Sequence, residues 1–206
     1  MIGPGEMHVW RVELDTIAEE RLPALSPEEA EQAARFSNSE LRRRYLRAHR
    51  ALRSILRNVL GNQPRIAIAT NGKPWLPDAP EWRFNLSHSR GLALIGVARG
   101  VDVGVDVEYI RPLKDWDNIV ERFFPASAAA EYFAAPEIDR GREFFRLWTR
   151  LEATWKASGV GLHGAGQEIA GPWTVVELDL GTGIAGAAAA QAEESQVVMR
   201  HFGEDQ

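Results

Sequence analysis

Hydrophobic positions recur along the chain with two different spacings, which predict strands in some segments and helices in others. Alternation over residues 8–14 predicts a half-buried strand, and Ser26, Pro27 and Glu29 are typical of a helix start. Over residues 39–60 the apolar positions step by three and four, which predicts the longest helix. Further strands are expected at 65–70, 82–86, 92–98, 103–108, 173–180 and 197–202, and further helices at 115–124, 127–134 and 139–158.

The order of these elements predicts an α+β fold in two similar halves, residues 1–103 and 104–206, within one compact unit. A chain of 206 residues is long enough to bury one substantial core. The Gly- and Ala-rich residues 181–190 predict a loop or a loosely packed helix between the last two strands.

Composition narrows the class of protein. Hydrophobic residues make up 45% of the chain and charged residues 26%, as in folded globular proteins. No stretch has the length and apolar character of a membrane helix, and the first residues lack the pattern of a secretory leader. Cysteine is absent, which excludes disulfides, thiolate nucleophiles and cysteine metal sites. These features predict a cytoplasmic protein that binds no membrane.

Charge is unevenly distributed along the chain. The formal net charge of −5 at pH 7 disfavours nucleic acid as a partner. Seven of the 24 Lys and Arg residues nevertheless lie between residues 42 and 57, and Arg43, Arg47, Arg50 and Arg57 form a stripe along one helix. Solvation alone can explain such a stripe, but its density in an acidic chain favours a phosphate-rich ligand.

Two carboxylates form the first candidate for chemistry. Asp106 and Glu108 alternate with Val103, Val105 and Val107, so the acids share one face of a strand and the valines share the other. An edge strand with a solvated acidic face explains this pattern about as well as a binding site does. The purely apolar opposite face favours a buried strand end whose acids meet a cation, and paired carboxylates suit Mg²⁺.

A second candidate lies on the last predicted helix. Glu152 and Lys156 are four residues apart and share a helix face, which as structure alone is an ordinary surface ion pair. Trp148 precedes Glu152 by four residues, and both Trp148 and Trp155 are expected to be buried. Glu152 then lies beside the buried stripe, where a carboxylate without a partner is costly. A role as a third metal ligand would offset that cost.

A third candidate is the group Ser87, His88 and Ser89 at the end of a predicted strand, with Lys73 and Pro74 shortly before it. Taken alone, a capped turn with an exposed histidine is the simpler interpretation. Other sites are excluded. The glycines at 159, 161 and 164 follow a helix rather than a strand, and no P-loop, zinc-spaced histidine pair or serine-hydrolase elbow is present.

Four motifs follow one another along the chain: Gly72-Lys73-Pro74, Phe84-Asn85-Leu86-Ser87-His88-Ser89, Gly104-Val105-Asp106-Val107-Glu108, and the run from Trp148 through Glu152 to Lys156. In order and spacing they resemble the Sfp-type 4'-phosphopantetheinyl transferase family. Arg35-Phe36 and Ala48-His49-Arg50-Ala51-Leu52 are similar to a motif in the first half of that family. The match spans about residues 35–162; each motif is weak alone, and the four together are specific.

The resemblance implies a pseudo-twofold α+β fold whose halves clamp coenzyme A. It implies that the 4'-phosphopantetheine arm is transferred to a serine of an apo acyl or peptidyl carrier protein, with release of 3',5'-ADP. Such carriers serve fatty acid, polyketide or nonribosomal peptide synthesis.

By the same resemblance, Asp106, Glu108 and Glu152 would hold Mg²⁺ against the diphosphate of coenzyme A, and Glu152 would also act as the general base. Lys156 would contact the phosphates. The residues expected at coenzyme A are Arg50, Ser87 and His88 at the 3'-phosphate, Lys73 and Pro74 at the adenine, and Arg47, added because it lies one turn from Arg50.

Two departures from the family pattern stand out. Leu151 occupies the position where a lysine commonly precedes the glutamate of the long-helix motif. The short helix after Ser26, which in relatives can carry lysines toward coenzyme A, holds Glu28, Glu29 and Glu31 here. We hypothesise that the arginines of the following helix compensate.

Two alternatives to an enzyme remain at this point. A non-catalytic coenzyme A or carrier-binding descendant is suggested by Leu151 alone, and an acidic interaction module is disfavoured by the arginine stripe. The segment from Arg111 to Ala135 is expected to recognise the carrier, although core packing is the simpler role for its apolar residues. A monomer is expected, because two halves of one chain can form the cleft.

Overall fold

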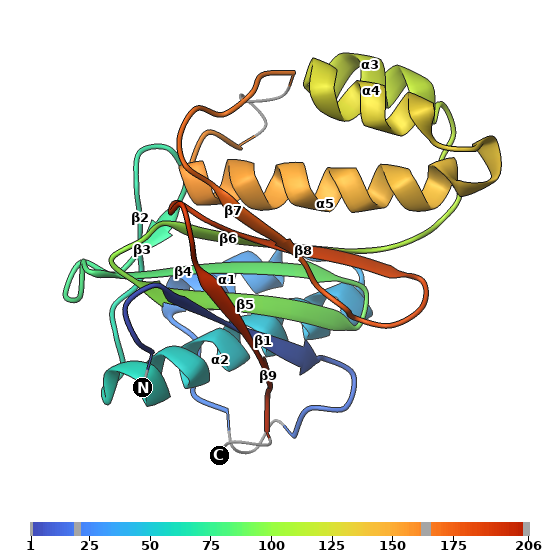
Figure 1. The fold of residues 1–206 in the computed structure, drawn as a ribbon. Helices are drawn as coiled ribbons and strands as arrows, with labels where there is room; N and C mark the ends of the chain where they lie inside the picture. The colour runs from blue at the N-terminus through green and yellow to red at the C-terminus, as the bar shows by residue number, and fades with distance from the viewer. Residues whose placement is uncertain (1, 19–21, 162–165, 204–206) are drawn as a thin grey trace.

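Strands and helices form stacked layers (Figure 1). The structure is a computed structural model that describes residues 2–18, 22–161 and 166–203. The strands of its two main sheets are β1 (Glu6–Glu13), β4 (Trp82–Ser89), β5 (Leu92–Arg99), β6 (Val103–Tyr109), β7 (Thr174–Glu177), β8 (Ile184–Ala190) and β9 (Gln196–His201). A four-stranded sheet has the order β4-β5-β1-β9, and a three-stranded sheet has the order β6-β8-β7.

The helices cover the outer faces of these sheets (Figure 1). They are α1 (Pro27–Ala34), α2 (Ser39–Leu60), α3 (Trp116–Phe123), α4 (Ala126–Ala134), the 3-10 helix η2 (Glu137–Asp139) and α5 (Arg140–Ser158). Helix α2 packs on the four-stranded sheet, α5 packs on the three-stranded sheet, and α3 and α4 pack on α5. A two-stranded hairpin of β2 (Ala67–Ile68) and β3 (Pro74–Trp75) lies beside β4.

Each boundary between layers has its own hydrophobic cluster. Representative buried members are Leu52 and Ile95 between α2 and the four-stranded sheet, Val9 and Val105 between the two sheets, Phe124 and Phe144 between α3, α4 and α5, and Ala153 and Ala187 between α5 and β8. The valines of β6 thus face the other sheet, as their alternation predicted. The acids of β6 therefore face away from that cluster.

The predicted helices are confirmed, and their ends have local causes. Helix α1 begins with a capping box between Ser26 and Glu29, and α2 begins at the side-chain cap of Asn38. Gly61 ends α2 in the left-handed region at φ 76°, where a residue without a Cβ carries little strain. The strands expected at 65–70 and 173–180 are shorter than predicted, because only β2 and β7 pair there.

The prediction of a loop or loose helix at 181–190 is wrong, because this segment contains β8, the central strand of the three-stranded sheet. Alanine has low strand propensity, so the local sequence does not show a strand. The physical reason for the alanines is the close approach of α5, whose Ala153 and Ala157 form a cluster with Ala187 and Ala189. Larger side chains on this face would push the helix away from the sheet.

The α+β class is confirmed, while the pseudo-twofold relation and the boundary at residue 104 stay predictions. Strand β9, from the end of the chain, pairs in parallel with β1 and so returns to the first sheet. Within the described residues, no helix is long and apolar enough to cross a membrane.

Candidate active site

The two sheets meet through a row of polar side chains on β4. Asn85 Oδ1 accepts a hydrogen bond from the Val105 backbone at 2.9 Å, which fixes the register of β6 against β4. Two residues later, Ser87 Oγ donates to Asp106 Oδ1 at 2.8 Å. Ser89 Oγ, two residues later again, donates to Glu108 at 2.9 Å. Alternation along β4 therefore matches each polar residue to a partner on β6.

Asp106 is the most deeply placed acid of this group, with 5% of its surface exposed. Its Oδ1 accepts hydrogen bonds from Ser87 and from Lys156 Nζ, the latter at 2.5 Å. Its Oδ2 is buried and has no hydrogen-bond partner among the described residues. A buried carboxylate oxygen without a partner is costly, so the site favours a ligand that supplies positive charge there.

Helix α5 places Glu152 and Lys156 against the same acid. Lys156 Nζ lies 3.8 Å from Glu152 Oε2 and also donates to Ser87 Oγ at 3.2 Å. Burial raises the pKa of Glu152, the charges of Asp106 and Glu108 raise it further, and Lys156 opposes both. The three carboxylates are thus close enough to interact, with the Lys156 ammonium as the counter-charge of Asp106 and Glu152.

The close approach of α5 depends on Gly104 of β6. A Cβ at this position would lie 2.0 Å from the Ala153 carbonyl oxygen and 2.6 Å from the Ala157 nitrogen. Only a glycine lets the helix backbone lie so near the strand, two residues before Asp106. This contact brings the helix acids and the strand acids to one place.

The donor set is suited to a hard divalent cation. Asp106, Glu108 and Glu152 offer carboxylate oxygens, which Mg²⁺ prefers, and the Asp106 Oδ2 atom has no other partner in the described chain. In the present side-chain arrangement, no three acid, histidine or cysteine side chains of the described residues form a ready metal cluster. Glu108 accepts hydrogen bonds from Ser89 and from Arg111 Nη1, the latter at 2.9 Å. The residues fit the metal chemically, and their assignment to it stays a prediction.

The two arginines predicted on the coenzyme A side both bond backbone carbonyls. Arg47 Nη1 donates to Leu14 at 2.7 Å, and Arg50 donates to Leu22 at 2.7 Å and Pro23 at 3.0 Å. These bonds tie α2 to the chain on either side of residues 19–21. The structure thus gives both arginines a role in holding Leu14, Leu22 and Pro23 against α2, in addition to any role at a ligand.

The side chains of the consecutive residues Lys73 and Pro74 face different surroundings. Lys73 Nζ donates to Asp102 at 2.8 Å and to the Ala157 carbonyl at the end of α5, so it links the hairpin to that helix. Pro74 lines a pocket of about 840 Å³ between the β2-β3 hairpin, α2 and β4. The structure therefore separates these neighbours, with Pro74 alone facing the pocket.

Ser87 and His88 point to opposite faces of β4. Ser87 is buried on the side of Asp106, whereas His88 follows Leu86 onto the side of α2. The His88 side chain is exposed, yet partial loss of hydration and the positive charges of His49 and Lys156 lower its pKa. The exposed His88 is therefore open to a ligand on the α2 side of β4, whereas Ser87 is buried against β6.

The apolar residues expected to dock a carrier belong mainly to the core. Phe124 is buried, and Trp116, Ile119 and Phe123 pack against the cluster beneath α3 and α4. Phe133 on α4 remains 39% exposed. Core packing was the simpler role for these side chains, and the structure confirms it for most of them.

The sequence of this chain is similar to those of known proteins. Residues 102–202 match the family model of the 4'-phosphopantetheinyl transferase superfamily. The 4'-phosphopantetheinyl transferase HetI of Nostoc sp. is 37% identical over 166 residues, 76% of this chain and 70% of HetI. The chain belongs to this superfamily. The transferase AcpT of Escherichia coli K12 is 31% identical over 83% of this chain and 79% of its own, and Sfp of Bacillus subtilis is 31% identical over 67% and 62%.

Membership makes the protein an enzyme of the 4'-phosphopantetheinyl transferase class and implies coenzyme A and a carrier protein as its reaction partners. Several supporting residues of this transferase were not predicted. Asn85 belongs to one of the motifs, but no role was predicted for it. The hydrogen bonds that Ser89 and Arg111 donate to Glu108 were not predicted either. A signal for the β4 row existed, because Asn85, Ser87 and Ser89 alternate at the period of a strand.

The transferase also has an ionic cluster at Glu29 that the sequence did not indicate. Glu29 accepts from Arg53 at 2.6 Å and lies 3.3 Å from His49, which stacks on Tyr45 at 4.1 Å between ring centroids. Burial opposes ionisation of Glu29, but these hydrogen bonds outweigh it and lower its pKa to about 2. Glu29 of α1 is therefore held by α2 through Arg53 and His49, while compensation by the α2 arginines toward coenzyme A stays a hypothesis.

Proposed function

We propose that the protein transfers the 4'-phosphopantetheine arm of coenzyme A to a serine of an apo acyl or peptidyl carrier protein in a magnesium-dependent reaction that releases 3',5'-ADP. The observation that carries this proposal is the convergence of Asp106, Glu152 and Lys156. Asp106 Oδ2 is buried without a described partner, and Lys156 Nζ contacts both acids. Such a group suits a divalent cation, which in turn would bind a substrate rich in phosphate charge.

Asp106, Glu108 and Glu152 would hold the metal in this proposal. Bound Mg²⁺ supplies positive charge that stabilises the developing charge on the diphosphate. Ser87 orients Asp106 through Oδ1, and Ser89 and Arg111 orient Glu108. These hydrogen bonds limit how far the two strand acids can turn.

The transfer forms a bond between the carrier serine oxygen and the phosphorus that bears the pantetheine arm. The bond from that phosphorus to the bridging oxygen breaks, and the 3',5'-ADP leaves. Glu152 accepts the serine proton, directly or through water, and its raised pKa makes it a better base than an ordinary glutamate. Lys156, whose Nζ lies 2.5 Å from Asp106 Oδ1, balances the negative charge that develops on the leaving group.

Coenzyme A would wrap around the β4 edge. We assign the adenine to the pocket lined by Pro74, which His49 and Leu86 also line, and the phosphate side to Ser87, His88 and Lys156. Arg47 and Arg50 would act from α2, and Lys73 would support this side through Asp102 and the end of α5. The support for this assignment is the pocket on one side of β4 and the acid group on the other.

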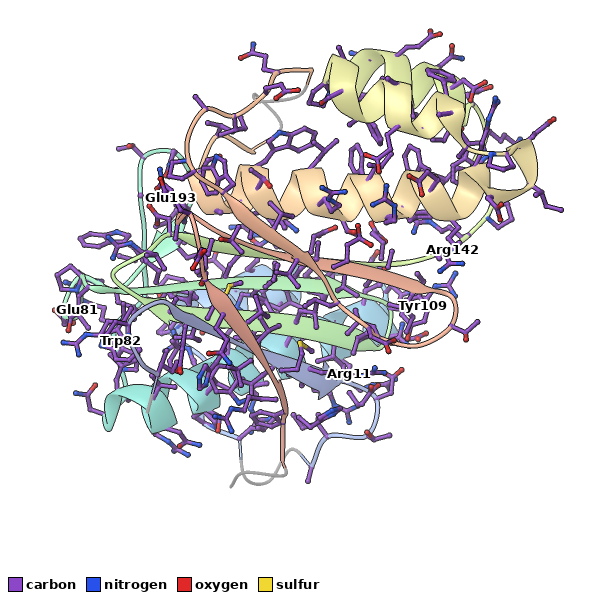
Figure 2. The ribbon with its side chains drawn as sticks, viewed as in Figure 1. Arg11, Glu81, Trp82, Tyr109, Arg142 and Glu193 are labelled. Atoms are coloured by element: carbon purple, nitrogen blue, oxygen red, sulfur yellow. The ribbon has the colours of Figure 1, made fainter. Side chains whose placement is uncertain are left out.

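Intact mass spectrometry of an apo carrier protein tests the proposal. The carrier is incubated with the enzyme and coenzyme A, with Mg²⁺ or with EDTA, and we expect a gain of one phosphopantetheine that disappears in EDTA. Glu152→Gln should lose the gain, whereas Glu193→Gln, which removes an exposed carboxylate in the chain after β8 (Figure 2), should keep it. Full activity in EDTA, or in Glu152→Gln, would overturn the metal and base assignments.

A further inference from the structure

A second pocket lies on the four-stranded sheet, on the face that turns away from the acids. It has a volume of about 400 Å³, within the range of small-molecule sites. Trp10 and Trp82 contribute from the sheet, Ile55 and Val59 from the end of α2, and Arg99 and Arg200 from strand ends. Figure 2 shows Trp82 at the start of β4, beside the end of α2.

The strand register explains why these residues share one face. Trp82 pairs with Arg99 across β4 and β5, and Trp10 pairs with Arg200 across β1 and β9. Cross-strand partners point to the same side of a sheet. Trp10 and Trp82 pack with the α2 cluster, whereas Met7 and Val9 face the three-stranded sheet. The four-stranded sheet therefore lies between this pocket and β6, the strand that carries Asp106 and Glu108.

The pocket combines flat apolar walls with positive charge. Both tryptophans are only half-buried, so part of each indole surface lines the pocket. The guanidinium of Arg99 lies 5.7 Å from the centre of the Trp82 ring. None of the described residues that line the pocket is Asp or Glu, although the chain as a whole carries a net charge of −5.

His8 holds the second arginine in place. Arg200 Nε donates to His8 Nδ1 at 3.4 Å, and His8 Nε2 lies 3.2 Å from Glu6 Oε2. The His8 side chain is 5% exposed, and burial lowers its pKa, which favours the neutral ring that can accept from Arg200. A buried chain of contacts thus fixes a cation at the pocket instead of leaving it to move in solvent.

We propose that this pocket binds a small amphipathic anion, whose flat apolar body lies between Trp10 and Trp82 and whose acidic group meets Arg99 and Arg200. The aromatic walls select the apolar body, and the two guanidinium groups select a carboxylate, sulfonate or phosphate. The site is distinct from the proposed coenzyme A cleft, because it shares no lining residue with the pocket assigned to the adenine and lies across the sheet from the acids.

The probe for this site is 1-anilinonaphthalene-8-sulfonate, an aromatic anion that fluoresces when its surroundings are apolar. Binding is followed by energy transfer from tryptophan, with coenzyme A and Mg²⁺ at saturating concentration so that the active-site cleft is filled. We expect saturable binding at one site that coenzyme A does not displace. Arg99→Gln should weaken it about tenfold, because one charged hydrogen bond is lost.

Two controls separate charge from general hydrophobic binding. Arg57→Gln, at an exposed position of α2 outside the pocket, should leave the affinity unchanged. The uncharged analogue N-phenyl-1-naphthylamine should bind Arg99→Gln and the wild type equally well. Asn58→Trp places a bulky group on the exposed rim and should block both probes, while thermal unfolding shows whether the variant is folded.

Three outcomes would overturn the proposal: displacement of the anionic probe by coenzyme A, equal weakening by Arg57→Gln and Arg99→Gln, or unchanged binding in a folded Asn58→Trp. Transfer to the carrier should be unaffected by Arg99→Gln, because this residue lies outside the proposed active site. The test does not depend on the proposed reaction, since probe binding is measured without turnover.

Discussion

Ser87 and Asp106 form a buried hydrogen bond of 2.8 Å between the edges of two sheets. The donor belongs to β4 of the four-stranded sheet, and the acceptor belongs to β6 of the three-stranded sheet. The same Asp106 oxygen accepts from Lys156 on α5, so three elements meet at one atom. The position of Asp106 therefore depends on how β4, β6 and α5 pack together.

Ser87→Ala removes this bond and the hydrogen bond that Lys156 donates to Ser87, but it leaves the bond from Lys156 to Asp106. We expect the free energy of unfolding to fall by about 1–2 kcal/mol, because a buried acceptor loses a donor. Transfer to the carrier should slow about tenfold, because Asp106 is less firmly oriented. Chemical denaturation and initial rates measure the two effects. Ser195→Ala, which loses a surface bond to Gly5, is the matched control, and equal rates in both variants would contradict the orienting role.

Asp106→Asn keeps the size of the side chain and removes its charge. We expect the transfer rate to fall at least about 100-fold, because the loss of an electrostatic contact to the transition state has this magnitude. Stabilisation by Mg²⁺ with coenzyme A in thermal unfolding should weaken as well. Asp78→Asn removes the carboxylate of the surface pair with Arg65 and should change neither quantity. Retention of a near-normal rate in a folded Asp106→Asn protein would exclude Asp106 from the site.

Glu152 should titrate at a higher pH than an ordinary glutamate. Burial and the charges of Asp106 and Glu108 raise its pKa, and only the ionised form can accept a proton. In the metal-free protein the Glu152 carboxyl should therefore have a pKa above the usual glutamate range, and it should lose its charge as the pH is lowered through that pKa.

The environment of Glu152 can also be tested without turnover. In EDTA, NMR titration of the Glu152 carboxyl should give a still higher pKa in Lys156→Gln, because the positive charge of Lys156, which opposes the shift, is removed. An unchanged or lower pKa in that variant would show that Lys156 is not the counter-charge of Glu152.

The sequence predicted which acids share a strand face better than it predicted the contacts that support them. Alternation with valine placed Asp106 and Glu108 on one face, because strand periodicity is a local property. The bonds of Arg47 and Arg50 to Leu14 and Leu22 depend on the path of a connecting segment, which no local pattern encodes. The prediction for the β8 segment was wrong for the same reason. Its alanines are small because they pack against α5, a helix about 30 residues earlier in the chain, and the local sequence does not show this contact.

Gly104→Ala tests the close approach of α5 to β6. The added Cβ would meet backbone atoms at 2.0 and 2.6 Å, so the helix has to move. We expect the free energy of unfolding to fall by about 2 kcal/mol or more. Transfer should be impaired beyond the loss of folded protein, because Glu152 and Lys156 move with the helix.

Gly3→Ala is the control for that substitution, since its Cβ would meet only the flexible end of Glu6 at 3.3 Å. Denaturation and initial rates are measured on both variants. Full activity per folded molecule in Gly104→Ala would mean that the site does not require this helix-strand contact.

Glu29→Gln tests the ionic cluster between α1 and α2. The pKa of Glu29 is about 2 in the folded protein against an ordinary value of 4.5, so its ionised form stabilises the fold above about pH 4.5. That contribution is about 3 kcal/mol at pH 7 and is lost as the pH falls from about 4.5 toward 2. At pH 7 we expect the variant to unfold about 6–12 °C below the wild type.

The difference between the two proteins should shrink as the pH falls through that window, because protonation of Glu29 in the wild type removes the same charge that the substitution removes. Glu31→Gln, whose pairing with Arg35 is exposed, is the matched control on α1 and should unfold within about 1–2 °C of the wild type. Calorimetric scans at pH 7 and at pH 3 make the comparison. A difference that stays constant with pH would show that the charge of Glu29 does not hold the two helices together.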